Sequence, residues 1–526
     1  MRAAILGPLA IAAAVPGKEV APHPPVAITT YADLPGHARS AAFTRMTAGG
    51  TPVAIAEYKG YGYARLATSG VTDVVLTAAA PVTSCEVYPK AHGILPTAQG
   101  HTCAFPVAST MQLEVRINSR ERLFLFADPP EAASPPCCDG ISVFDVTTYP
   151  RVDRTGRTKS TGIQAAIIDV AGKSACSNSS PCTLYFKSGT YLAGQLFLRS
   201  RMRLFLESGA KLKASTDPSD YELDPGTHRT AFIVAENVSY TGIHGRGALD
   251  GDGLAYRRKN NASSPYPYWK CRTSTNAMCW DSPRLVLIRR SHHVTVRDVM
   301  ILDPAAWTNH IHYSDRVTYD NVKVLDDRIK FNTDAVDVDA STNVTVRNSF
   351  YHGRDDGFCV KATKELGLIR TSSNIRFYDN TVGYGHNATK LGTETNVGGN
   401  MDAVVIRNLY VTDHHGRAFG VYVKDGNSVG QTTGITVDGV YVDSGGRQGF
   451  AIEIVKRRGI GHVDNVTLRN FNLPSTIGTS TVYGYDDTHR VRNVSIMGYR
   501  IGGVLRKTLS GARIAKNAYT TNITIE

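Results

Sequence analysis

Several features that mark other classes of protein are missing from this 526-residue sequence. Beyond its first residues no apolar run is long enough to cross a bilayer, so the mature chain should be soluble, without a membrane partner. Lys and Arg do not form blocks, and the aromatic residues (8%) are not interleaved with them, which argues against nucleic acid as a partner. No cysteine spacing resembles a zinc site. These absences leave a soluble protein with another kind of ligand.

The composition that is present favours β-structure. Gly is abundant (48 residues), and Val, Thr, Tyr and Asn recur in short runs. The net charge of +12 is compatible with a polyanionic substrate, and equally with a basic surface that is simply solvated.

The beginning of the chain and its cysteines are typical of export. Residues 1–17, MRAAILGPLAIAAAVPG, predict a secretory signal peptide and hence an extracellular protein. Eight Asn-x-Ser/Thr sequons fit glycosylation, although several Asn residues could simply serve turns. The nine cysteines predict three disulfides and a free thiol, with one adjacent pair unassigned: Cys85/Cys103, Cys176/Cys182, Cys271/Cys279, free Cys359, and Cys137 with Cys138.

Two compositional breaks divide the chain. Residues 25–128 alternate in short strands with turn signals between them, which predicts a small β-sandwich. Residues 129–140, rich in Pro, predict a linker. After it, Ile163, Ala166, Ile167 and Val170 fall on one face of a short helix.

Residues 141–526 are repetitive. Strand starts of similar form recur at intervals of 23 to 31 residues, anchored at Val294, Val317, Val344, Ile375, Val404, Ile435, Val466 and Val494. Such a period, made of strands without helices, predicts a solenoid of the parallel β-helix type. The alternative is an antiparallel sandwich, which would need Asn-Gly or Asp-Gly turns that are few here.

A second set of strands gives the register of outward residues. It places Asp337, Cys359, Lys390, Tyr422 and Glu453 at one phase on successive coils, between apolar neighbours that point inward. In this register Asp334 and Asp356 also occupy equivalent positions on two neighbouring coils. Since neighbouring parallel strands lie about 4.7–4.9 Å apart, Asp334, Asp355 and Asp356 should converge on one patch.

Three carboxylates that close cannot all ionise freely, so the pKa of at least one should be raised. This suits hydrolysis of a glycosidic bond, in which one carboxylic acid protonates the departing oxygen and other carboxylates activate water. Two alternatives stay open: Asp-Asp-Gly is also a turn sequence, and clustered carboxylates also bind calcium. His386 follows its anchor by 11 residues, as Asp355 follows its own, so its side chain should lie beside the carboxylates and could assist an acid. Lys424 could reach a substrate from the same face. As an alternative, Lys390 and Lys424 could be merely solvated.

These residues resemble those of glycoside hydrolase family 28, the polygalacturonase and rhamnogalacturonase group, over roughly residues 140–510. The likeness lies in Asn332-Thr333-Asp334, Asp355-Asp356, Gly385-His386 and Tyr422-Val423-Lys424. It implies an all-β fold, a right-handed, pectin-lyase-like parallel β-helix, and hydrolysis with inversion, without a metal or cofactor. It implies Asp355 as general acid, Asp334 and Asp356 activating water, and His386 assisting. Candidate substrate-binding residues are Asp337, Lys390, Tyr422 and Lys424.

Three features depart from the family pattern. Asn387 stands where the family has a second glycine, and Tyr422 replaces an arginine that binds a uronate carboxylate. Asn387-Ala388-Thr389 is also a sequon, whose glycan would obstruct long chains. A β-sandwich before a β-helix is similar to glycoside hydrolase family 49, the dextranase and isopullulanase group, so the sugar stays open.

Three hypotheses follow. The first is a secreted, monomeric, metal-independent hydrolase of a polysaccharide or oligosaccharide, pectin-type first and neutral α-glucan second. The second is a calcium-dependent polysaccharide lyase with Lys361 or Lys390 as base. The third is a non-catalytic carbohydrate-binding β-helix.

Overall fold

The computed structural model describes residues 26–131, 138–222, 230–260, 282–365, 367–395, 399–425, 430–455 and 460–526, without the side chains of residues 260, 424 and 425. The predicted signal peptide and the Cys271/Cys279 pair lie outside the described residues. The chain divides into two compact units: residues 1–30 with 39–131, and residues 31–38 with 132–526. Residues 31–38, which the sequence places in the sandwich, thus group with the second unit. No helix among the described residues is long and apolar enough to span a membrane.

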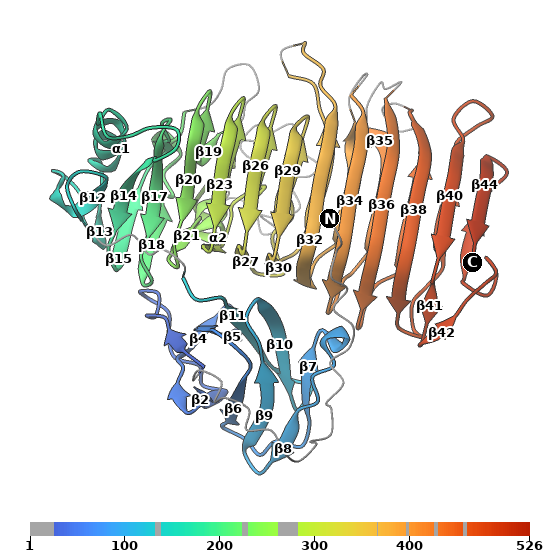
Figure 1. Cartoon of the computed structure of the whole chain (residues 1–526), viewed down its shortest axis with the longest axis horizontal. Helices are drawn as coiled ribbons and strands as arrows, with labels where there is room; N and C mark the ends of the chain where they lie inside the picture. The colour runs from blue at the N-terminus through green and yellow to red at the C-terminus, as the bar shows by residue number, and fades with distance from the viewer. Residues whose placement is uncertain are drawn as a thin grey trace, which may run out of the picture. The chain divides into compact units, whose positions relative to one another are not determined.

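The first unit is a sandwich of two sheets around its own apolar core (Figure 1). All pairs are antiparallel except β11 with β5. Its strands are β1 (Ile28–Thr30), β2 (Phe43–Ala48), β3 (Thr51–Pro52), β4 (Ile55–Tyr58), β5 (Tyr61–Thr68), β6 (Thr72–Ala78), β7 (Cys85–Tyr88), β8 (Thr97–Gln99), β9 (Thr102–Val107), β10 (Met111–Ile117) and β11 (Glu121–Asp128).

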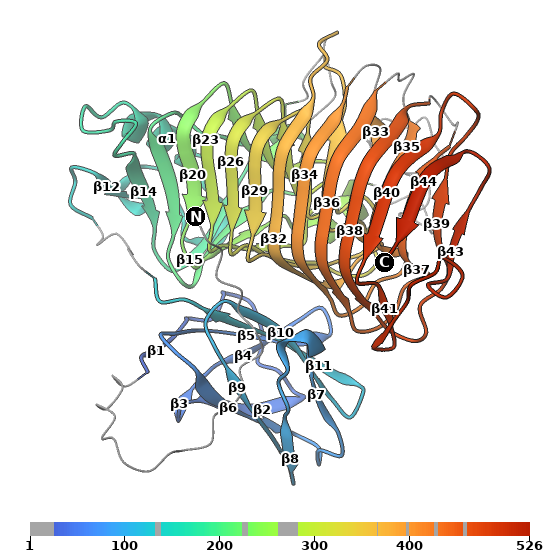
Figure 2. The same ribbon diagram turned by 45° about the vertical axis from the view of Figure 1, so that its right-hand side comes forward.

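The second unit is a coil of parallel strands, which Figure 2 shows side by side along one axis. Its longer sheet contains β12 (Val143–Asp145), β13 (Thr155–Lys159), β14 (Cys182–Phe186), β15 (Gly189–Ala193), β17 (Met202–Leu206), β18 (Ala210–Ala214), β20 (Ser239–His244), β21 (Ala248–Asp250), β23 (His292–Arg297), β24 (Met300–Leu302), β26 (Asp315–Asp320), β27 (Lys323–Leu325), β29 (Thr342–Arg347), β30 (Phe350–His352), β32 (Ser372–Tyr384), β34 (Met401–Val411), β36 (Gln431–Val442), β38 (His462–Leu473), β40 (Val491–Met497), β41 (Arg500–Ile501), β42 (Val504–Leu505) and β44 (Thr520–Ile525).

Its shorter sheet carries the acidic residues. It contains β16 (Leu196–Phe197), β19 (Ala231–Glu236), β22 (Arg284–Arg289), β25 (Asn309–His312), β28 (Val336–Asp339), β31 (Phe358–Ala362), β33 (Asn387–Thr395), β35 (Arg417–Asp425), β37 (Gln448–Ile454), β39 (Ser480–Tyr483) and β43 (Ile514–Lys516). The helices are α1 (Ile163–Ala171) and α2 (Gly253–Asn260), with 3-10 turns at Lys90–His92, Val146–Thr148 and Pro218–Asp220. The predicted all-β fold, a right-handed parallel β-helix preceded by a sandwich, is confirmed.

The sequence repeat and the coil coincide. Every predicted anchor pairs with the next one, from Val294 with Val317 to Val466 with Val494, and each is at most 1% exposed. Burial of such a side chain stabilises the fold by about 1.5–3 kcal/mol. Helix α1 buries the predicted face of Ile163, Ala166, Ile167 and Val170. The anchors and this helix are therefore confirmed.

One left-handed residue precedes each anchor. Its φ lies between 50° and 64° on eleven coils: Arg201, Tyr240, His293, Arg316, Asn343, Asn374, Ala403, Gly434, Asn465, Asn493 and Asn522. Asn and Gly tolerate this conformation best, so the recurring Asn-Val-Thr runs have a structural cause at the turn. Arg201, Tyr240, His293 and Arg316 are the bulky exceptions.

The cysteine predictions are partly tested. Cys85–Cys103 and Cys176–Cys182 are disulfides, and Cys359 is a buried free thiol, as predicted. Cys138 is disulfide-bonded.

Candidate active site

The candidate site lies along one column of residues at the starts of successive strands of the shorter sheet. Arg417 pairs with Asn387 on one side and with Gln448 on the other. Backbone hydrogen bonds from Thr308 to Asp334, Ala335 to Asp356 and Gly357 to Asn387 continue the same alignment. The column therefore runs Arg284, Trp307, Asp334, Asp356, Asn387, Arg417 and Gln448.

Three carboxylates converge at the centre of this column. One oxygen each of Asp334, Asp355 and Asp356 lies within 4.8 Å of the other two. Asp334 and Asp356 are 3% and 1% exposed, whereas Asp355 is only half-buried. The expected convergence is present, and Asp355 is the most exposed of the three carboxyl groups.

Backbone contacts hold the two acidic loops together. Asp355 accepts hydrogen bonds from the N–H groups of Asn332 (2.7 Å) and Asp356 (3.0 Å). The hydroxyl of the buried Tyr351 donates to the carbonyl oxygen of Thr333 (3.1 Å) and accepts from the N–H of Asp355 (3.1 Å). The positions of the acids are thus set by two loops that share one buried phenol.

A buried lysine fixes the start of the first loop. The ammonium of Lys330 ion-pairs with Asp303 (2.7 Å), Asp327 (2.8 Å) and Asp326. Arg257 donates to the carbonyl oxygen of Phe331 (2.7 Å). The three carboxylates around Lys330 form a second acidic cluster, but they already share one ammonium group at its centre, so the cluster anchors the loop.

The pKa values of the three acids separate. Burial raises the pKa of Asp334 well above its usual range, with the charges of Asp337 and Asp355 adding to the effect. Burial and Asp356 likewise raise the pKa of Asp355. Burial would raise the pKa of Asp356 as well, but the ammonium of Lys390 outweighs it and the pKa is lowered. Opposite shifts on adjacent carboxyls are what acid and base catalysis require.

Two side chains of the next coil, Asn387 and Lys390, stabilise the ionised form of Asp356. Its Oδ1 accepts from the N–H (3.2 Å) and the side-chain amide (2.6 Å) of Asn387. Its Oδ2 ion-pairs with Lys390, whose pKa is raised because the attraction of Asp356 exceeds the effect of burial. Asn387 is 2% exposed and its amide donates to Asp356, an arrangement that leaves no room for a glycan on this side chain. Glycosylation at this sequon stays a prediction.

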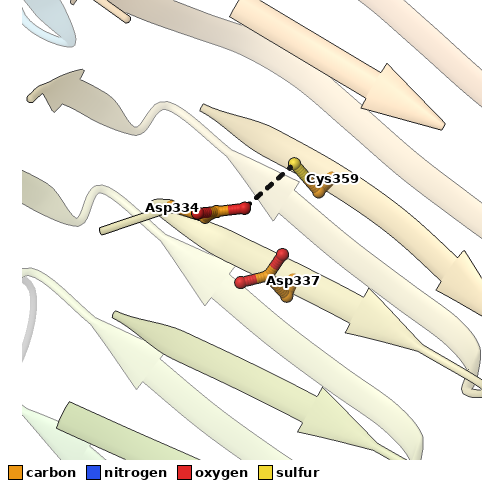
Figure 3. Close-up of side chains that lie close together, drawn as sticks. All are labelled: Asp334, Asp337 and Cys359. Carbon is orange, nitrogen blue, oxygen red and sulfur yellow. Dashed lines mark hydrogen bonds between the residues drawn. The ribbon is translucent and has the colours of Figure 1, made fainter. Parts of the chain in front are cut away.

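Asp337 lies beside Asp334 rather than at an open surface. Figure 3 shows the carboxylate of Asp334 directed at the thiol of Cys359, 3.9 Å away, with Asp337 next to them. Lys361 lies 3.8 Å from Asp334 and 3.4 Å from Asp337, and it ion-pairs with Glu394 at 2.7 Å. Burial, and the charge of Glu394, raise the pKa of Asp337 to about 7 despite Lys361.

His386 is attached to the site through its backbone. Its N–H donates to the carbonyl oxygen of Asp355 (2.8 Å), while its ring lies 5.6 Å from that of His415. Burial lowers the pKa of His386, although Asp356 and Asp355 oppose this. The ring is half-buried at the edge of the acidic group, where a neutral imidazole could contact a sugar.

The register predicted between Lys390 and Tyr422 is wrong: Lys390 pairs with Gly420, and Tyr422 pairs with Gly392. The steps from Asp337 to Cys359, Cys359 to Lys390 and Tyr422 to Glu453 are confirmed. A β-carbon on Gly420 would lie 2.8 Å from the Tyr422 ring, so this ring fills the space beside Lys390 where another side chain would stand. The side chain of Lys424 lies outside the described residues.

The ring of Tyr422 supports an arginine that the sequence did not single out. The guanidinium of Arg417 lies over the ring, 4.8 Å from its centroid, and its Nε donates to Gln448 (2.7 Å). Among the described residues, its two terminal amino groups have no hydrogen-bond or ion-pair partner. Arg417 therefore presents a positioned, half-buried cation two coils beyond Asp356.

An aromatic side chain stands on the opposite side of the acids. Trp307 is half-buried, one coil before Asp334, with the ammonium of Lys361 4.3 Å and the guanidinium of Arg284 5.2 Å from its ring. Trp307 and Arg417 were missed because neither belongs to a recognisable motif. Asn387 was noted as a departure from the family pattern and as part of a sequon, but its contact with Asp356 was not predicted. All three residues are in register with Asp334 and Asp356, and this register is the signal that could have found them.

Comparison with known proteins identifies the family of the chain. Residues 176–481 match glycosyl hydrolases family 28. The chain is 26% identical to a polygalacturonase of Ralstonia solanacearum over 297 residues, covering 48% of this chain and 54% of the relative. It is 27% identical to an endo-polygalacturonase of Pectobacterium carotovorum subsp. carotovorum over 267 residues, covering 48% and 62%. It thus spans little more than half the length of these relatives.

Two solved structures share the fold. The hyperthermoactive exopolygalacturonase from Thermotoga maritima has a TM-score of 0.57 at 18% identity, covering 73% of this chain and 91% of that one. Dex49A from Penicillium minioluteum has a TM-score of 0.56 at 14% identity, covering 94% and 96%. Because the family match alone spans more than half of its residues, this chain belongs to glycosyl hydrolases family 28.

Proposed function

We propose that this protein is a secreted polygalacturonase-type hydrolase that cleaves an acidic polysaccharide by acid–base catalysis with three aspartates. The observation that carries the proposal is the triad of Asp334, Asp355 and Asp356, in which Lys390 lowers one pKa while burial raises the others. The identity of the relatives as polygalacturonases supports the substrate class.

In the proposed mechanism Asp355 is the general acid, because it is half-buried and its pKa is raised. Its proton passes to the glycosidic oxygen as the bond from that oxygen to the anomeric carbon breaks. Asp356, kept ionised by Lys390, takes a proton from water as the water oxygen bonds to the anomeric carbon. Asp334 orients that water and His386 contacts the sugar, whereas Asp337 is buried beside Asp334 and lies 3.4 Å from Lys361.

We propose inversion of the anomeric centre, although the carboxyl separation is short. Inverting enzymes usually space their two carboxyls about 6.5–9.5 Å apart, and retaining ones about 5–5.5 Å; here the oxygens lie within 4.8 Å. A covalent intermediate would need a carboxylate free to attack. Asp356 is poorly suited, since bonding to carbon would neutralise the carboxylate that Lys390 and Asn387 hold in place. Accepting a proton from water needs only the second lone pair of one oxygen, and both contacts can stay.

Proton NMR of the first product tests inversion. Digestion of polygalacturonate followed from the first minutes should show the anomer opposite to that of the cleaved bond, before mutarotation mixes the two. Initial release of the same anomer would contradict the proposal and indicate that Asp334 or Asp356 acts as a nucleophile.

The column supports a uronate substrate despite the loss of the family arginine at Tyr422. Arg417 offers two free amino groups beyond the acids, and a guanidinium binds a carboxylate through two parallel hydrogen bonds. Trp307, flanked by Arg284 and Lys361, offers an aromatic face before the acids. The lyase alternative is not favoured, because its candidate bases Lys361 and Lys390 both have raised pKa values and stay protonated.

A reducing-end assay on polygalacturonate, rhamnogalacturonan, dextran and pullulan, with and without EDTA, tests the function. We expect turnover of polygalacturonate that resists EDTA, and none of dextran or pullulan. For Arg417→Ala we expect KM on polygalacturonate to rise about 10- to 100-fold with kcat little changed, because a charge-assisted hydrogen bond contributes about 1.5–3 kcal/mol.

The matched control is Arg469→Ala, an exposed arginine on β38 of the other sheet. It should leave KM unchanged. An unchanged KM for Arg417→Ala would remove this residue from substrate recognition, and turnover of dextran alone would overturn the uronate proposal.

Secretion is part of the proposal. The two disulfides among the described residues support it, because disulfides persist in oxidising compartments. The monomeric state stays a prediction.

A further inference from the structure

A second pocket lies on the outer face of the longer sheet. Its volume is about 470 Å³, within the usual range of ligand sites. It spans strands β17, β20, β23, β26 and β29, and none of its residues belongs to the acidic column. Its lining includes Arg203, Tyr240, His244, His293, Thr295, Arg316 and Thr318.

The backbone at this pocket departs from the rule that other coils obey. Later coils place Asn, Gly or Ala at the left-handed position before each anchor, whereas four successive coils here place Arg201, Tyr240, His293 and Arg316 there. The last three of these line the pocket. A bulky residue in this conformation is disfavoured, and such positions concentrate at functional sites. The rings of Tyr240 and His293 stack at 4.5 Å with 9° between their planes. Both residues line the pocket.

The floor of the pocket is polar and open. Arg203 pairs with Gly242, which pairs with Thr295, which pairs with Thr318. A β-carbon on Gly242 would lie 2.1 Å from the carbonyl oxygen of Thr295 and 3.1 Å from the ring of His244, so no side chain fits between Arg203 and Thr295. The threonine hydroxyls and the guanidinium therefore face the same space.

Charge in the pocket is positive and incompletely paired. Arg316 pairs with Asp315, and Arg297 lies 3.6 Å from Asp298. Arg203 has no carboxylate partner among the described residues, and its Nε is buried without a hydrogen bond. Burial, with the charges of Arg297 and Arg203, lowers the pKa of His244 to about 3, so this ring is neutral.

We infer that this pocket is a second carbohydrate site that binds an acidic sugar of the substrate polymer. It lies on the longer sheet, whereas the acidic column lies on the shorter one. The stacked rings offer a face for a pyranose, Arg203 a cation for its carboxylate, and Thr295 and Thr318 hydroxyls for its hydroxyl groups. The choice of an acidic sugar rests on the proposed function. Binding here would hold a polymer to the enzyme between cleavage events.

The test is a double variant, Arg203→Gln with Tyr240→Asn. Asparagine is the residue that other coils carry at this position, so the fold should be retained, which a thermal melt checks. Affinity electrophoresis through gels containing polygalacturonate should show retardation of the wild type, with an apparent Kd raised about tenfold in the variant. Gels containing dextran should retard neither protein. Arg469→Gln serves as the matched control and should behave as the wild type.

Turnover separates this inference from the proposed function. We expect the double variant to keep the wild-type rate on trigalacturonate and to lose efficiency on the polymer. Equal retardation of variant and wild type by polygalacturonate would overturn the second site, whatever the turnover. Absence of turnover by the wild type would overturn the proposed function, while a difference in retardation would still support the site.

Discussion

Replacing Asp355 by asparagine is expected to lower kcat on polygalacturonate by about 10²- to 10⁴-fold, the usual contribution of a general acid. The amide cannot supply the proton that the departing oxygen needs. It also keeps only one of the two acceptors that now receive the N–H groups of Asn332 and Asp356, so stability should fall by about 1 kcal/mol. KM should change little, because the lost interaction belongs to the transition state.

Initial rates over a range of substrate concentrations, together with a thermal melt, check this expectation. Asp438→Asn is the matched control, since Asp438 accepts a hydrogen bond from Asn470 (2.8 Å) at an exposed position on the other sheet. It should retain full activity. If Asp355→Asn kept more than a tenth of the wild-type kcat, another group, first of all Asp334 with its raised pKa, would have to be the acid.

Lys390→Met is expected to shift the pH dependence of the enzyme. In the wild type Lys390 holds the pKa of Asp356 below its ordinary value, so the base is already ionised at mildly acidic pH. Without the ammonium, burial raises that pKa. The acidic limb of kcat/KM should then move to higher pH, with a loss of about 10²-fold at mildly acidic pH.

The same change in the pKa of Asp356 also alters how the stability of the fold depends on pH. A carboxyl whose pKa is lowered in the folded state stabilises the fold above its unfolded pKa, and this contribution is lost as pH falls through the folded pKa. In Lys390→Met the folded pKa of Asp356 lies above the unfolded one, so the sign reverses. The variant should lose stability as pH rises, since an unpaired buried charge costs about 3–5 kcal/mol.

Profiles of kcat/KM and of melting temperature against pH measure both effects. Lys516→Met, at an exposed lysine on β43 of the same sheet, is the control and should reproduce the wild-type profiles. An acidic limb that did not move in Lys390→Met would show that Asp356 is not the group whose ionisation limits the rate.

The coil could be predicted because its physical cause is local and repeated. Each anchor from Val294 to Val494 is an apolar residue that must be buried, and from Val344 onward each follows a left-handed Asn, Gly or Ala. Helix α1 could be predicted for the same reason, because its apolar residues fall on one face. The grouping of Asp334 with Asp355 and Asp356 also came from the repeat, since equal phase on adjacent coils means proximity.

The predicted register between Lys390 and Tyr422 was wrong, because the packing of a ring, and not the spacing of residues, decides which residues pair there. Tyr422 occupies the expected interval after Lys390, yet Gly420 is the residue that pairs with it. The ring of Tyr422 needs the space that Gly420 leaves empty, and a pattern of apolar and polar residues carries no information about the space that a ring takes up.

The sequence by itself therefore determined the solenoid, its period, and which acids meet, because burial of alternate side chains dictates register. Only the tertiary structure decided how those acids are charged and what surrounds them. The ionised state of Asp356 depends on Lys390 and Asn387, and the position of Arg417 depends on the ring of Tyr422. Charge and stacking act between atoms a few ångströms apart, and that proximity arises only once the coils are closed.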